Sequence, residues 1–146
     1  MVYAAMDTDV IRQLDEQQKK AFLHAFIKMA CVDGCFDERE KNFIYNAALA
    51  FGLDYKTTEE LMKHQDSKQI LKEVSLIQNR AVALELIKEL CLLSHTDGQL
   101  SDEETLFIGE VAQSMNIELE KVEQISNWVI NYLILHEQSK IVFEQI

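Results

Sequence analysis

Proline is absent from this chain of 146 residues, and glycine occurs only four times. At an average usage of about 5%, a chain of this length would contain roughly seven prolines. Proline and glycine are the residues that most strongly interrupt helices. Their scarcity therefore favours a helical protein.

Further properties of the sequence exclude several classes of protein. The three cysteines are an odd number, which argues against a disulfide framework and fits a reducing compartment. Fourteen basic residues face 25 acidic ones, and the resulting net charge of −11 repels nucleic acid and anionic lipid. The longest apolar run, 129–135, is too short to span a bilayer, and the N-terminus lacks the pattern of a signal peptide. We therefore expect a cytoplasmic protein with no nucleic-acid partner and no direct membrane insertion.

Apolar residues make up 48% of the sequence and recur at helical spacing along nearly all of it. This periodicity predicts an all-α protein, a single domain over residues 1–146 with about seven helices. The first expected helix has a possible break near Asp15. The expected helices span about 10–33, 37–51, 56–64, 66–77, 80–97, 102–115 and 118–137.

A short pattern occurs twice, 64 positions apart. Segments 21–64 and 85–128 share seven identities, and five of them fall within residues 33–44 of the first copy. The shared pattern is Asp-Gly, an apolar residue two positions later, a capping residue, Glu, and then Phe-Ile. We interpret the two segments as pseudo-symmetric helix–turn–helix repeats that bury their apolar faces against each other in one body.

Acidic residues flank both repeated turns, and two interpretations of them stay open. Asp37 and Ser101 are followed three positions later by Glu40 and Glu104, which is the spacing of a capping box at a helix start. The Asp-Gly pairs that precede them can likewise be simple turn formers. On the first interpretation the acids only shape the turns.

The second interpretation is a cation site. At helical spacing, Asp33 and Asp97 continue the apolar faces of the helices that they end, so carboxylates from both sides of each turn point inward. Partly buried carboxylates need a compensating cation or a proton. Oxygen ligands suit Ca²⁺, Mg²⁺ or Mn²⁺. The predicted metal ligands are Asp33, Asp37, Glu40, Asp97 and Glu104.

The duplicated motif resembles that of the TerB-like, tellurite-resistance family over roughly residues 15–135. This resemblance implies a bacterial, cytoplasmic, all-helical domain with internal pseudo-symmetry and no known catalysis. It also implies a link to stress responses and acidic sites proposed for divalent metals at the positions named above. The second copy departs from the motif at Ser101, where an acid is expected. Its cation site should therefore be the weaker one.

The sequence shows no nucleophile beside a base and no phosphate-binding loop, so we do not expect an enzyme. We expect a stress-response module that binds a divalent metal through its acidic Asp-Gly turns. The alternative is a protein-interaction or scaffold domain, similar to a co-chaperone, whose acids only cap helices. Both hypotheses leave room for an unidentified protein partner.

Overall fold

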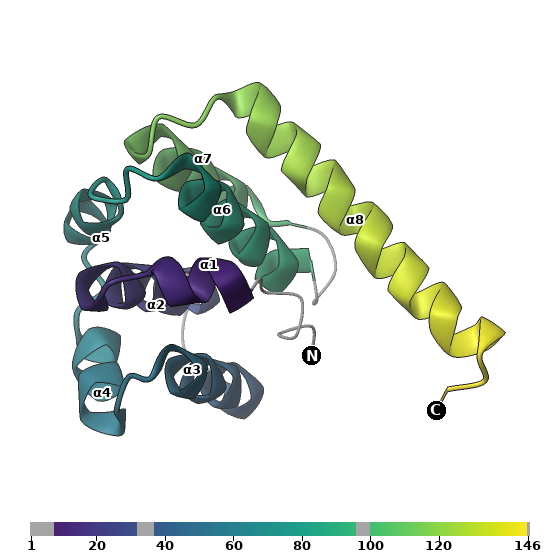
Figure 1. Cartoon of the computed structure of the whole chain (residues 1–146), viewed down its shortest axis with the longest axis horizontal. Helices are drawn as coiled ribbons and strands as arrows, with labels where there is room; N and C mark the ends of the chain where they lie inside the picture. Colours follow the sequence, from purple (N-terminus) through teal and green to yellow (C-terminus); the bar gives the residue numbers. More distant parts are fainter. Residues whose placement is uncertain (1–7, 32–36, 96–99, 146) are drawn as a thin grey trace.

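The computed structural model describes residues 8–31, 37–95 and 100–145 (Figure 1). The described residues form eight α-helices and no strand, which confirms the all-α prediction. The helices are α1 (Thr8–Gln13), α2 (Glu16–Ala30), α3 (Glu38–Phe51), α4 (Tyr55–Lys63), α5 (Ser67–Val74), α6 (Arg80–His95), α7 (Asp102–Ser114) and α8 (Leu119–Val142).

Polar side chains fix where most of these helices begin. Asp15, Asp37 and Ser101 each accept a hydrogen bond from the third helical amide, and the residue there bonds back to the cap amide. Asp15 thereby separates α1 from α2, at the predicted break. Asp54 and Asp66 cap α4 and α5 in a simpler way, through one amide each. Satisfying these otherwise unpaired amides is what stops each helix from starting elsewhere.

The ends of α3 and α7 share one geometry. Gly52 has φ of 76° and Asn116 has φ of 60°, so both occupy the left-handed region that glycine and asparagine tolerate best. The amide of the next residue then reaches back to the helix, with Leu53 N to Ala48 O and Ile117 N to Ala112 O both 2.8 Å apart. The two helices therefore have matching caps at both ends. The pseudo-symmetry of the two whole segments stays a prediction.

Helix α2 lies at the centre of the body and packs against α3, α4, α5 and α6. Its buried aromatic residues, Phe22 and Phe26, contact Phe43 and Phe51 of α3, with ring centroids 5.8 to 6.3 Å apart. Helix α6 continues this core and packs against α7, α8 and α1. The core is thus one continuous cluster that joins both sequence repeats.

His24 is a buried polar residue whose partners come from distant parts of the sequence. The residue is only 3% exposed, on the inner side of α2. Its Nδ1 lies 2.6 Å from Glu73 Oε1 of α5, and its Nε2 lies 2.5 Å from the carbonyl oxygen of His64. Both partners are distant in sequence, so helical periodicity could not reveal them.

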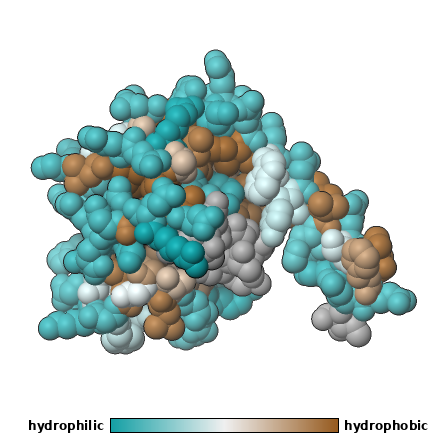
Figure 2. Space-filling model, viewed as in Figure 1, coloured by the Kyte–Doolittle hydropathy of each residue, from teal (hydrophilic) through white to brown (hydrophobic). Residues whose placement is uncertain are grey.

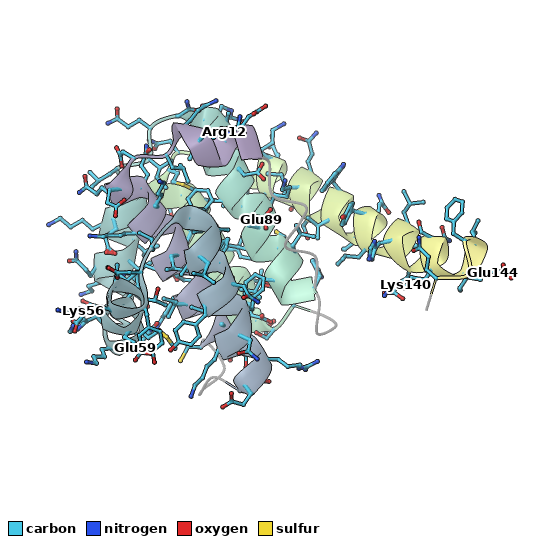
Figure 3. The ribbon with its side chains drawn as sticks, turned by 60° about the horizontal axis from the view of Figure 1, so that its bottom comes forward. Arg12, Lys56, Glu59, Glu89, Lys140 and Glu144 are labelled. Carbon is cyan, nitrogen blue, oxygen red and sulfur yellow. The ribbon has the colours of Figure 1, made fainter. Side chains whose placement is uncertain are left out.

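Helix α8 has two unlike parts. Up to Leu133 it packs against α6 and α7, with Val129 buried and Val122, Ile125, Tyr132 and Leu133 against the core. Beyond Leu133 no described residue of the helix joins the core. The helix instead continues as a straight arm away from the body (Figures 1 and 3). In the described part of the chain, no helix is both long enough and apolar enough to cross a membrane.

Candidate functional site

The structure describes three of the five predicted site residues, and these three lie at two helix starts. Asp37 is the exposed cap of α3, and Glu40 is partly buried one turn later. Asp37 Oδ1 accepts from the Glu40 amide at 2.7 Å, and Glu40 Oε1 accepts from the Asp37 amide at 3.2 Å. Asp33 and Asp97 lie outside the described residues.

Glu104 has the equivalent place at the start of α7. Its Oε1 accepts from the Ser101 amide at 2.9 Å, and its own amide donates to Ser101 Oγ at 3.1 Å. All three described acids therefore take part in capping boxes, which supply hydrogen bonds to carboxylates at the positive end of a helix dipole. This geometry accounts for Asp37, Glu40 and Glu104 without a cation.

No group of three or more His, Cys, Asp or Glu side chains within the described ranges is arranged to hold a metal ion. The predicted site draws two of its five ligands from outside those ranges. The cation hypothesis therefore stays a prediction.

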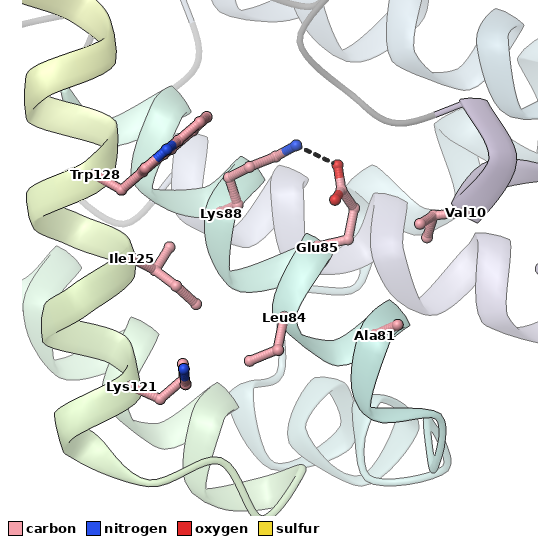
Figure 4. Close-up of a pocket in the computed structure, with 8 residues that line it drawn as sticks. All are labelled: Val10, Ala81, Leu84, Glu85, Lys88, Lys121, Ile125 and Trp128. Atoms are coloured by element: carbon pink, nitrogen blue, oxygen red, sulfur yellow. Dashed lines mark ion pairs between the residues drawn. The ribbon is translucent and has the colours of Figure 1, made fainter.

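A pocket of about 490 Å³ lies between α6 and α8, with α1 at its edge (Figure 4). Its size falls within the range of small-molecule sites, roughly 300 to 1,000 Å³. Most of its lining is apolar, and the polar groups are two lysines and one glutamate. These lining residues include no hydroxyl, thiol or imidazole that could act as a nucleophile or base beside a substrate. They are Val10, Ala81, Leu84, Glu85, Lys88, Lys121, Ile125 and Trp128.

Two charged residues of α6, Glu85 and Lys88, line this pocket, and the buried carboxyl group of Glu89 lies near Lys88. The ammonium of Lys88 lies 2.5 Å from Glu85 Oε1 and 3.7 Å from Glu89 Oε1. Glu89 is only 3% exposed, and its Oε1 has no hydrogen-bond partner. Burial raises the pKa of Glu89 to about 8, the Lys88 ammonium opposes this rise, and the Glu85 carboxylate adds to it. Glu89 is therefore largely protonated at neutral pH.

Sequence reasoning did not single out Glu89, although the signal was present. The residue stands among Leu86, Leu90 and Leu93, one helical turn from each outer member of that apolar stripe. A glutamate inside an apolar stripe predicts a buried carboxyl group. Buried groups with shifted pKa values often mark functional sites, although structural ion pairs shift them too.

Most of the large exposed apolar side chains among the described residues lie on α8, from Trp128 onward, and on Phe143, which follows it. Of twelve large hydrophobic side chains that are exposed in the described residues, seven occur between positions 128 and 143. Patches of brown, hydrophobic atoms lie among teal, hydrophilic ones on the projecting arm in Figure 2. We call these seven residues the apolar end of α8. They are Trp128, Ile130, Ile134, Leu135, Ile141, Val142 and Phe143.

Comparisons with known proteins agree with the resemblance seen in the sequence. Residues 4–63 match the model of the family described as tellurite resistance protein TerB. No curated protein and no solved structure matches the chain. The family match covers α1, α2, α3 and α4, including the cap at Asp37 and the turn at Gly52. The match therefore supports a TerB-like domain in this part of the chain.

Proposed function

We propose that this protein is a non-enzymatic module of a tellurite-resistance type of stress response, that it acts in the cytoplasm, and that it works by contacting protein through α8. The supporting observation is the apolar end of α8, which the body leaves uncovered. Large contiguous apolar patches are rare on the surfaces of monomeric soluble proteins. Where they occur, they commonly mark interaction sites. This proposal corresponds to the scaffold interpretation of the sequence.

The described acids of the two turns fit this proposal, because each has a structural role as a helix cap. A module that works by contact needs only a stable body and an exposed surface. The ion pair of Lys88 and Glu85 and the protonated carboxyl of Glu89 likewise require no reaction to explain them.

The proposal can be tested in cells from which the gene has been deleted. Wild type and two variants are returned, and growth is measured in the presence of tellurite. Leu135→Lys places a charge on the apolar end of α8, where the side chain is 63% exposed. Leu106→Lys on α7 is the matched control, because the same side chain is 65% exposed there. We expect Leu106→Lys to restore tolerance and Leu135→Lys to fail.

Two outcomes would contradict the proposal. Unchanged tolerance after gene deletion would contradict a role of the protein in the stress response. Full rescue by Leu135→Lys would contradict the role of α8. Both variants change exposed positions, so a helix content equal to that of wild type should confirm that they fold.

Divalent-cation binding has its own test, independent of α8. Calorimetric titration with Ca²⁺, Mg²⁺ and Mn²⁺ at about 1 mM compares wild type with the Asp33→Asn, Glu40→Gln double variant, because weak oxygen-ligand sites bind in that range. Binding that the double variant loses would support the cation hypothesis. Absence of binding by wild type would rule it out and leave the acids as caps and turn formers.

A further inference from the structure

The apolar end of α8 is large enough for a stable protein interface. Its seven side chains are between 37% and 80% exposed. For residues of this size, such exposure leaves on the order of 700 Å² of apolar surface. A standard interface buries roughly 800 Å² per partner, so one helical arm supplies most of what a partner needs.

The charge of this arm differs from that of the rest of the chain. The whole chain carries −11, and a second copy would be repelled by most of its surface. Between Gln124 and Phe143, however, the only side chains of Asp, Glu, Lys or Arg are Glu137 and Lys140. These two form an ion pair with each other at 3.0 Å. The arm is therefore a neutral surface on which two copies can meet without electrostatic repulsion.

The side of α8 that faces away from the body also carries amides. At 3.6 residues per turn, Asn127, Asn131 and Gln138 lie opposite the buried Val129. An amide contains both a donor and an acceptor, so it can pair with the same type of group across a two-fold axis. Amides between apolar residues also fix the register of paired helices.

We propose that the apolar end of α8 binds the apolar end of α8 from a second copy of this chain, with the two helices antiparallel. This inference rests on the proposed function and names its partner. In an antiparallel pair centred near Leu135, Trp128 of one copy lies beside Val142 of the other. The two bodies then lie at opposite ends of the helix pair. A parallel pair would bring the two acidic bodies together, where their charges repel each other.

The oligomeric state tests the pairing. Sedimentation of the whole chain between about 1 and 100 µM spans the affinities expected of such an interface. Wild type and Leu106→Lys should sediment at twice the chain mass of 16.9 kDa, and Leu135→Lys should sediment at the chain mass. Leu135→Lys should keep the helix content of wild type, because the side chain is exposed. A wild type that stays monomeric over this range overturns the proposal, whatever else α8 binds.

Cross-linking tests the orientation. Equal amounts of Trp128→Cys and Val142→Cys chains are mixed and oxidised, and the linked peptides are identified by mass spectrometry. A disulfide requires Cα atoms within about 7 Å, so only neighbouring positions react. The antiparallel pair predicts links between position 128 of one copy and position 142 of the other. Links of each position to itself would show a parallel pair and overturn the proposed arrangement.

Failure of this inference can be distinguished from failure of the proposed function. If wild type is monomeric and Leu135→Lys still abolishes tellurite tolerance, α8 contacts a different protein, so the inference fails while the proposed function stands. If wild type is dimeric and Leu135→Lys restores tolerance, the pairing stands and the role of α8 in the stress response fails.

Discussion

The body of the molecule and the projecting end of α8 are both helical and both rich in apolar residues, but they use those residues in opposite ways. In the body, side chains such as Phe26 and Leu86 are completely buried. In the arm beyond Leu133, Leu135 and Phe143 are 63% and 69% exposed. The difference teaches that hydrophobic content alone does not identify a core. What decides burial is whether another element lies opposite, and none of the described elements packs against the arm.

The largest expected difference between the two regions comes from removing one phenyl ring from each. Phe26→Ala should lower the free energy of unfolding by about 3 to 5 kcal/mol, because it leaves a cavity among Phe22, Phe43 and Phe51. Phe143→Ala should lower it by less than about 0.5 kcal/mol. Urea unfolding followed by circular dichroism measures both, in chains that also carry Leu135→Lys so that pairing of α8 does not contribute. Equal losses would mean that the arm is part of the cooperative core.

The next effect concerns Glu89, a buried titrating group in the body. Glu89 binds its proton up to a pH of about 8 in the folded state, whereas the unfolded chain releases it near pH 4.5. Between these values the folded state holds the extra proton, so this group makes stability fall as pH rises, by about 1 kcal/mol per pH unit. Glu89→Gln should remove that slope and stabilise the protein by roughly 2 kcal/mol or more at pH 8.

Unfolding measured at pH 5, 6.5 and 8 tests this expectation. The control is Glu103→Gln, the same substitution at an exposed position of α7. Its stability should follow that of wild type at all three values of pH. An unchanged slope in Glu89→Gln would show that the carboxyl of Glu89 is already ionised in the folded protein.

Removing a helix cap should also lower the free energy of unfolding more in the body than at the start of α8, but by a smaller amount. Asp37→Ala and Ser101→Ala each remove a capping box from the body and should cost about 1 kcal/mol. Glu118 precedes α8 but forms no cap with its side chain, and its exposed ion pair with Arg80 contributes little. Glu118→Ala should therefore cost less than about 0.5 kcal/mol. A similar loss at all three positions would contradict the distinction between the body and α8.

The smallest effect is expected from shortening the arm. A chain that ends at Glu137 should match the full chain in free energy of unfolding within about 0.5 kcal/mol, since no described residue beyond Leu133 joins the core. Both chains should carry Leu135→Lys, so that pairing of α8 does not contribute by mass action. A loss above about 1 kcal/mol would place part of the arm in the folding unit.

The sequence predicted those features that depend on neighbouring residues. The caps at Asp37 and Ser101 follow from local patterns, and the structure confirms them. The burial of His24 depends on Glu73, 49 positions away, which no local pattern encodes. Likewise, the periodicity of α8 predicts a helix but does not tell which of its turns meet the body.

The candidate site likewise combines features that local sequence patterns predict with features that depend on distant residues. Capping was one of the two interpretations of Glu40 and Glu104, and local hydrogen bonds now account for both residues. The pocket at Lys88 and Lys121 brings together two helices from distant parts of the sequence. Its existence depends on the angle at which α8 crosses α6, which hydrophobic spacing does not specify.

Because of its hydrogen bonds, the ring N–H of His24 can report when the helices around it separate. The carbonyl oxygen of His64 can only accept, so Nε2 must carry a hydrogen that is shielded from water. That hydrogen can exchange with solvent only when α2 separates from the segment that joins α4 to α5. In an NMR spectrum, its signal would therefore persist for as long as these elements stay together, and its decay in deuterated water would time their separation.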